Sequence, residues 1–136
     1  MDTKKLDELI IQLENYLECW KQFNHSINLA RTKKFDGEDE NQFLEVKSVL
    51  TQELEMIVSS LEFSNPSKDD VHSLLGSATS LRFLSELNEG AFRALENQWH
   101  KIYIGLQSVL GQLKVRQRQV EAPKSVWSSI FGRKKS

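Results

Sequence analysis

The sequence predicts an all-α protein, an antiparallel four-helix bundle, and three observations support this. Apolar residues recur at alternating steps of three and four, as along one face of an α-helix. The 136 residues include only six Gly and two Pro, so few turns are expected. At this length one compact core is expected, and we divide the chain into a bundle domain, residues 1–122, and a C-terminal segment, residues 123–136.

The first periodic segment is expected to form a helix from about Thr3 to Ala30. Leu9, Tyr16 and Phe23 widen its apolar stripe, which is then broad enough to pack against two neighbours in a bundle. Asn24 interrupts the stripe and has three interpretations: a polar group that fixes helix register, part of a binding site, or a solvated residue at the bundle end. The stripe itself consists of Leu6, Ile10, Leu13, Leu17, Trp20 and Ile27.

The stretch KKFDGEDE predicts a loop in which Asp36 or another acid caps a second helix. That helix should cover about Glu38 to Glu62 and end within FSNPSKDD, because Pro66 favours an extended conformation in the residue before it. Ser67 and Asp70 then resemble a capping box that starts a third helix. The inward residues of the second helix are Phe43, Val46, Leu50, Leu54, Ile57 and Leu61.

The third helix is expected to continue through GSATS, residues 76–80, whose small side chains allow close helix contact. The fourth, from about Gly90 to Val120, has the most regular apolar stripe, so we expect it to be the central core helix. LNEG, residues 87–90, predicts a turn between them. In the alternative, two helices accompany one long helix over residues 68–121, which would need a dimer to cover it. The stripe of the fourth helix is Phe92, Leu95, Trp99, Ile102, Leu106, Val109 and Leu113.

No catalytic or metal-binding pattern stands out, so we expect a protein that is not an enzyme and holds no cofactor. Di-metal carboxylate bundles use Glu-x-x-His pairs, and the chain has none. His72 and His100 each lie beside an apolar stripe, where surface pairs with acids are expected. Cys19 is expected to be a partly buried structural residue whose thiol pKa is raised by Glu18. A small-ligand pocket near Gly76 to Ser80 is a secondary interpretation of GSATS.

The chain ends in SVWSSIFGRKKS, in which four apolar residues fall on one face of a short helix and three basic residues follow. So short a helix is unstable alone, and it should become ordered only against another surface. That surface could be its own bundle, a groove in a partner protein, or an anionic membrane. The residues that we assign to partner binding are Val126, Trp127, Ile130, Phe131, Arg133, Lys134 and Lys135.

The charge of the chain is divided unevenly between its two parts. Residues 1–113 carry a net charge of −7 and residues 114–136 a net charge of +6, although the total is only −1. This division indicates an anionic partner at the basic end, although basic residues also suit a helix C-terminus and a solvated tail. Lys114, Arg116 and Arg118 are spaced by two and so spread around a helix, which disfavours nucleic acid as the partner.

A cytoplasmic location is expected, because the single cysteine cannot form an intramolecular disulfide and the N-terminus lacks a signal-peptide core. No stretch approaches the roughly 18 apolar residues that span a bilayer, so membrane contact would be peripheral. The leading hypothesis is a non-enzymatic helical-bundle interaction or adaptor protein that docks onto a partner protein through its C-terminal segment. The alternatives are a peripheral membrane-binding protein that uses the same segment, and a ligand-binding or enzymatic bundle. Homodimerisation is left open.

Overall fold

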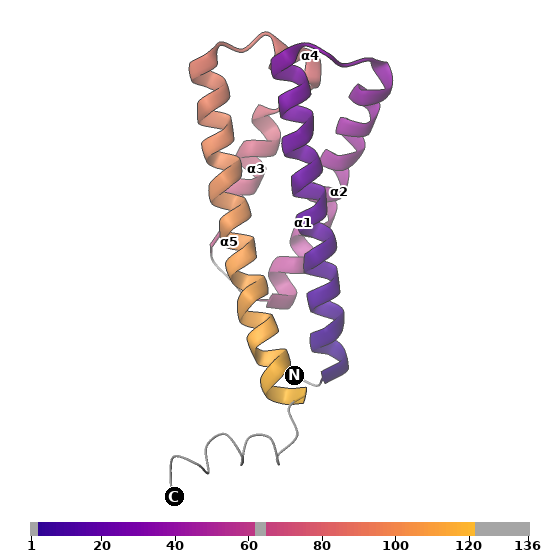
Figure 1. The fold of residues 1–136 in the computed structure, drawn as a ribbon, viewed down its shortest axis with the longest axis vertical. Coiled ribbons are helices and arrows are strands. Elements are labelled where there is room, and N and C mark those ends of the chain that lie inside the picture. The colour runs from indigo at the N-terminus through magenta and orange to yellow at the C-terminus, as the bar shows by residue number, and fades with distance from the viewer. Residues whose placement is uncertain (1–2, 62–64, 122–136) are drawn as a thin grey trace, which may run out of the picture.

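The computed structural model describes residues 3–61 and 65–121 and confirms an all-α helical bundle (Figure 1). Four long segments run alternately up and down: the first two are α1 and α2, the third is divided into α3 and the short α4, and the fourth is α5. The first described residues of α1 and the last of α5 lie at the same end of the bundle. The helices are α1 (Thr3–Thr32), α2 (Gly37–Leu61), α3 (Lys68–Ser77), α4 (Leu81–Ser85) and α5 (Glu89–Glu121).

The helix with the most extensive packing is α1, not the fourth long segment as the sequence had predicted. α1 contacts α2, α4 and α5, whereas the main neighbours of α5 are α1 and α3. The physical reason is the side chains of α1, since Tyr16, Trp20 and Phe23 are all completely buried and are among the largest core residues. Residues of this size need neighbours on several sides.

Three of the predicted helix boundaries are confirmed by their caps. Asp36 and Asp39 each accept a hydrogen bond from the other's backbone N–H, at 2.9 and 3.0 Å, at the start of α2. The hydroxyl of Ser67 accepts from the N–H of Asp70 at the start of α3. The side chain of Asn88 accepts a hydrogen bond from the N–H of Ala91 at the start of α5. The predicted turn before α5 is therefore present, and the alternative of a single helix over residues 68–121 is wrong.

The predicted third helix is wrong in one respect, because it breaks at residues 78–80 and resumes as α4. The break is held by α2. The carboxylate of Glu40 accepts from the N–H groups of Leu81 and Arg82, at 2.8 and 3.3 Å, and Lys47 donates to the carbonyl of Thr79 at 3.4 Å. The hydroxyl of Ser80 caps the new helix. GSATS therefore ends α3 at Ser77, and its last three residues form the break before α4.

Close helix contact occurs instead at Gly105, a buried residue on α5. A Cβ atom built there would lie 2.8 Å from Cδ of Pro66, so any larger residue would displace the loop that leads into α3. At Gly76, by contrast, a Cβ would meet no atom within 4 Å. The small residue that lets two segments approach is thus on α5, not in the GSATS stretch.

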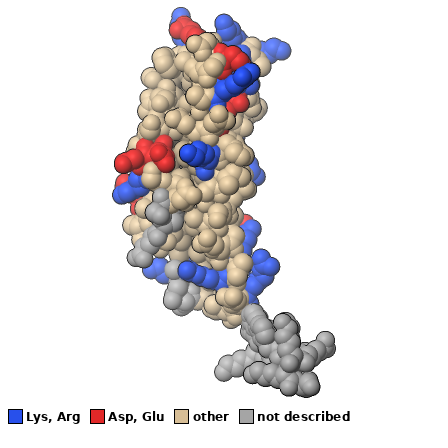
Figure 2. All heavy atoms as spheres, turned by 90° about the vertical axis from the view of Figure 1, so that its left-hand side faces the viewer, with Lys and Arg blue, Asp and Glu red and all other residues tan. Residues whose placement is uncertain are grey.

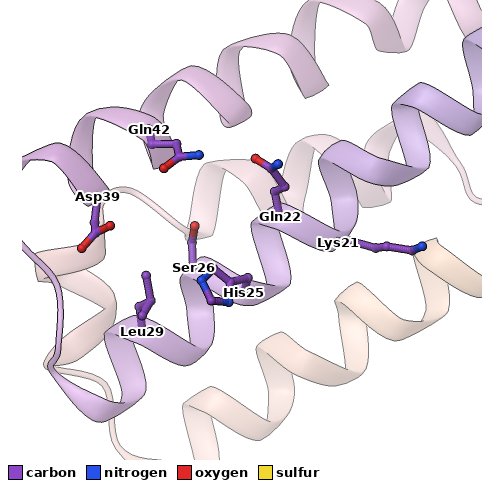
Figure 3. Close-up of a pocket in the computed structure, with 7 residues that line it drawn as sticks. All are labelled: Lys21, Gln22, His25, Ser26, Leu29, Asp39 and Gln42. Atoms are coloured by element: carbon purple, nitrogen blue, oxygen red, sulfur yellow. The ribbon is translucent and has the colours of Figure 1, made fainter.

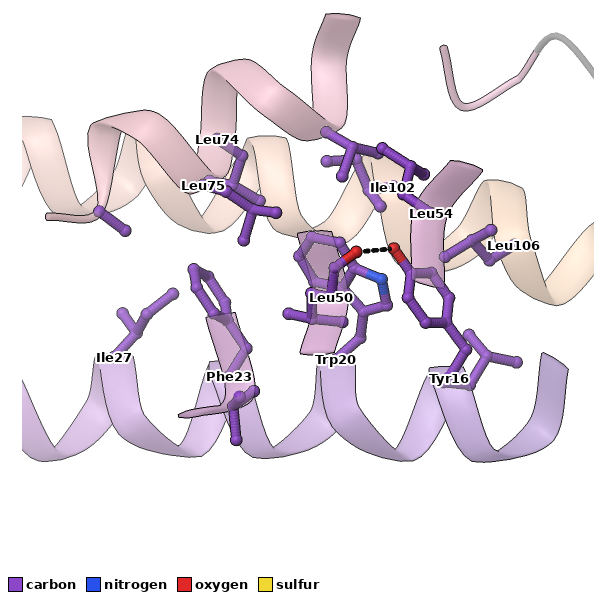
Figure 4. Close-up of a cluster of buried hydrophobic side chains, with 14 of the residues drawn as sticks. Tyr16, Trp20, Phe23, Ile27, Leu50, Leu54, Leu74, Leu75, Ile102 and Leu106 are labelled. Carbon is purple, nitrogen blue, oxygen red and sulfur yellow. Dashed lines mark hydrogen bonds between the residues drawn. The ribbon is translucent and has the colours of Figure 1, made fainter. Parts of the chain in front are cut away.

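The core fills the space between α1, α2, α3 and α5 (Figure 4). Leu106 is completely buried, as expected, whereas Trp99 is only partly buried and donates from its indole Nε1 to the carbonyl of Trp20 at 2.8 Å. Between α1 and α2, the hydroxyl of Tyr16 donates to the carbonyl of Leu50 at 2.7 Å. These two hydrogen bonds tie α1 to both of its long neighbours.

We predict that Leu106→Ala lowers the free energy of unfolding by about 2 to 5 kcal/mol, because it leaves a cavity in a close-packed core. Urea unfolding followed by circular dichroism measures the change. The matched control is Leu44→Ala on α2, where the side chain is 45% exposed, and there the change should stay within about 0.5 kcal/mol. Equal losses in the two variants would contradict the packing described here.

We also predict that one of the two tyrosines fails to ionise until the chain unfolds. Burial raises the pKa of Tyr16 far above its ordinary value of 10.0. The unfolded chain therefore loses this proton more readily than the folded chain. The contribution of Tyr16 to the free energy of unfolding is thus fully present below about pH 10, and it decreases as the pH rises further. Tyrosinate absorbance during an alkaline titration should show a step that coincides with unfolding. Tyr16→Phe should remove that step, and Tyr103→Phe should leave it.

Candidate functional site

The residues assigned to partner binding from the sequence lie outside the described residues, so that assignment stays a prediction. What the structure adds is their point of attachment. α5 ends at Glu121, beside the first turn of α1, so the fold brings Lys4 and Lys5 to the same end of the bundle as Arg116 and Arg118 (Figure 1). Lysine and arginine side chains gather at this end of the surface (Figure 2). The sequence could not reveal this grouping, because the two pairs are more than a hundred residues apart.

The basic residues at this end differ in their partners. Lys114 pairs with Glu14 of α1 at 3.3 Å, and Gln117 donates to Asp7 at 2.8 Å. These contacts hold the lower parts of α1 and α5 together. Arg116 is exposed and takes part in none of the ion pairs found among the described residues.

The residues that the sequence singled out for possible chemistry are not brought together. His72 on α3 and His100 on α5 are both exposed, and Cys19 on α1 is partly buried. Among the described residues, no group of three or more His, Cys, Asp and Glu side chains is placed to hold a metal ion. The hollow between α3 and α5 lies near the start of α3, away from GSATS, and its lining includes Pro66, Asp70, Ser73 and Lys101.

A groove of about 280 Å³ between α1 and α2 contains the residue types of a catalytic triad (Figure 3). His25 and Ser26 come from α1 and Asp39 from α2, with Gln42 beside them. Sequence reasoning missed this group because no carboxylate lies at helical spacing from His25. Only the antiparallel packing of α1 and α2 brings Asp39 to the same groove.

The geometry of this groove does not support nucleophilic catalysis. A serine nucleophile needs a base within hydrogen-bond reach and a third group that orients the base. Among the hydrogen bonds of the described residues, none joins Ser26, His25 and Asp39 to one another, and Asp39 instead caps α2. Ser26 is only 8% exposed. The groove therefore holds no assembled triad.

On its other side, α1 meets α5 across a polar cluster centred on Arg31. Arg31 forms ion pairs with Glu96 and, at 3.4 Å, with Glu89, and its guanidinium lies 5.2 Å from the centre of the Phe92 ring. These interactions make Arg31 a tie between the two helices. Glu96, which lies one turn from His100 on α5, thus pairs with Arg31 of α1.

Asn24 belongs to the same surface and is half-buried. It lines a shallow hollow between α1 and α5 together with Asn28, Asn97, Trp99 and His100. It therefore lies beside a helix contact, neither in the core nor at the bundle end. Trp99 also stacks on Tyr103, with ring centres 4.8 Å apart and 14° between the planes.

Comparison of the chain with models of protein families, with curated proteins and with solved structures finds no match. Within residues 3–61 and 65–121, no helix is both long enough and apolar enough to cross a membrane. The fold and its surfaces thus define an all-α bundle with polar grooves on both sides of α1.

We predict that Cys19 reacts slowly with thiol reagents in the folded chain. Burial, and then the nearby carboxylates of Glu53 and Glu18, raise the pKa of its thiol, so less of the reactive thiolate is present at neutral pH. The rate of reaction with a disulfide reagent, measured at constant pH with and without urea, should be higher for the unfolded chain. Glu53→Gln should increase the folded rate. A folded chain that reacts faster than the unfolded one would contradict the prediction.

Proposed function

We propose that the chain is a non-enzymatic adaptor, a helical-bundle interaction protein that docks onto a partner protein through residues 123–136. The observation that carries this proposal is the sequence of that segment, which combines an amphipathic aromatic face with three basic residues. Large aromatic residues dominate the energy of protein interfaces. Basic residues near them speed association with an acidic surface.

The packing of the bundle supports the proposal. The buried hydrophobic residues of the described part extend from Leu6 to Leu113 and belong to all five helices. A core of this extent is consistent with a bundle that folds before its C-terminal segment meets a partner. We include a cytoplasmic location in the proposal on the grounds of the sequence alone.

A second candidate function is peripheral membrane binding through the same segment. The observation that favours it is the placement of Lys4 and Lys5 at the end of the bundle where α5 ends. Basic residues near an amphipathic anchor strengthen binding to anionic lipid by about 1 kcal/mol each. Sedimentation with phosphatidylserine vesicles and with neutral vesicles separates the two functions, because only membrane binding requires the anionic lipid.

We predict that deleting residues 124–136 leaves the helical content and the thermal midpoint nearly unchanged and abolishes partner capture from cell extract. The double variant Trp127→Ala and Phe131→Ala should do the same, since each ring can contribute on the order of 2 kcal/mol at an interface. Circular dichroism and affinity capture measure the two effects. A fall of several degrees in the midpoint, with blue-shifted Trp127 fluorescence in the free protein, would make the segment part of the fold.

We predict a different effect when the three basic residues of the segment are substituted. Neutral residues in place of Arg133, Lys134 and Lys135 should slow association with the captured partner and reduce its dependence on salt, because rim charges act mainly on the encounter. The matched control neutralises Lys33 and Lys34, two exposed lysines at the far end of α1. If both sets of substitutions slow association equally, the effect reflects overall charge and not this segment.

A further inference from the structure

The outer face of α5 is open along more than three turns, and its exposed side chains over residues 102–113 are uncharged. Ile104 and Val115 are each 48% exposed there, and Ser108 and Gly111 between them are exposed as well. These four residues follow at steps of four, three and four, so they form one line along the helix. We call them the outer stripe of α5. A Cβ atom at Gly111 would meet no atom within 4 Å, so nothing described covers the middle of the stripe.

The charge around the outer stripe is unusual for an exposed helix in an acidic chain. Residues 102–113 include no charged residue, and residues 97–120 include no Asp or Glu. Four cations lie in this region: Lys101 above the stripe, Arg116 and Arg118 below it, and Lys114 beside its lower part, where it pairs with Glu14 of α1. Figure 2, which shows the side of the bundle that is on the left in Figure 1, has an uncharged area with basic and acidic side chains above it and mainly basic side chains below it. An exposed helix face normally includes charged residues, and over residues 102–113 this face has only uncharged ones.

We propose that the outer stripe of α5 docks an amphipathic helix of a partner protein, one with acidic residues near both ends of its apolar face. Ile104 and Val115 supply the apolar anchors, about 16 Å apart along the helix. Ser108 and Gly111 between them let a second helix approach closely. Lys101 and Arg118 are about 25 Å apart, so acids at either end of a partner helix of four to five turns would reach both.

Charge complementarity excludes a second copy of this chain as the occupant. An antiparallel pair would match Ile104 with Val115 and Ser108 with Gly111, but it would also place Lys101 against Arg118 at both ends. A parallel pair would place each cation against itself. Like charges in contact disfavour an interface. The same reasoning excludes the chain's own residues 123–136, which carry four basic residues and no acid.

The probe is a labelled synthetic helix of about 20 residues, long enough to span both cations, with Ala and Leu on one face and Glu beside it. Fluorescence anisotropy with the full chain should show saturable binding that weakens as salt is added. A matched peptide with Lys in place of Glu should not bind. If both peptides bind alike, the contact is non-specific adhesion of an apolar helix and the proposal fails.

Gly111→Leu should weaken binding of the Glu peptide on the order of tenfold or more, because it fills the point of closest approach. The matched control is Gly76→Leu on α3, where the added side chain also enters open space. Both changes favour helix formation, so neither should lower the thermal midpoint. A second variant, Lys101→Glu with Arg118→Glu, should reverse the preference of the chain from the Glu peptide to the Lys peptide.

A further variant distinguishes peptide binding at the outer stripe of α5 from peptide binding by the C-terminal segment. Trp127→Ala with Phe131→Ala should leave binding of the Glu peptide unchanged, since the proposal does not depend on residues 123–136. Loss of peptide binding in that variant, or unchanged binding in Gly111→Leu, would overturn the proposal. Sedimentation of the free chain gives a further test, because a dimer that Gly111→Leu dissociates would show that a second copy occupies the stripe.

Discussion

The packing of Trp20 at the middle of α1 is the contact on which the rest of the bundle depends. Its ring is completely buried, 6.2 Å from the ring of Tyr16 and 5.5 Å from that of Phe23, both in edge-to-face geometry. Phe23 in turn packs on Phe43 of α2 at 5.5 Å. On the opposite side, the carbonyl of Trp20 accepts the indole N–H of Trp99 from α5. Since edge-to-face pairs and a partly buried hydrogen bond meet at Trp20, the spacing of α1, α2 and α5 is set there.

A helix packed on two sides has two polar edges, and this explains the grooves beside α1. His25 and Ser26 lie at the edge that meets α2, and Asn24 and Arg31 lie at the edge that meets α5. Arg31 uses its charge to join the helices, and Asp39 uses its carboxylate to cap α2. The polar residues of these grooves therefore mainly stabilise the fold. A ligand site would need polar side chains that take no part in such contacts, and Ser26 is one of these.

The parts of this fold that were predictable from the sequence are those set by local rules. Apolar spacing predicted the inward faces, and capping residues predicted the starts of α2, α3 and α5, because each cap lies within three residues of the N–H it satisfies. The break before α4 was not predictable in this way. Nothing in GSATS forces it, and it is held by Glu40 and Lys47, which are more than thirty residues away in the sequence. The grooves beside α1 were missed for the same reason, since their residues meet only through tertiary packing.

The outer face of α5 was predictable from the sequence only in part. Its lack of acids and its uncharged stretch are visible in the sequence, but the same pattern would describe a helix buried on all sides. Only the structure distinguishes the two, because Leu106 and Ile104 are two residues apart and one is buried while the other is half-exposed. α5 thus has one face that packs in the core, which includes Leu106, and one open and largely uncharged face, which includes Ile104. At the edge between α1 and α5, by contrast, polar side chains such as Arg31 join the two helices. A substitution at Gly111 on the outer face of α5 therefore removes no contact between helices, whereas a substitution at Arg31 does.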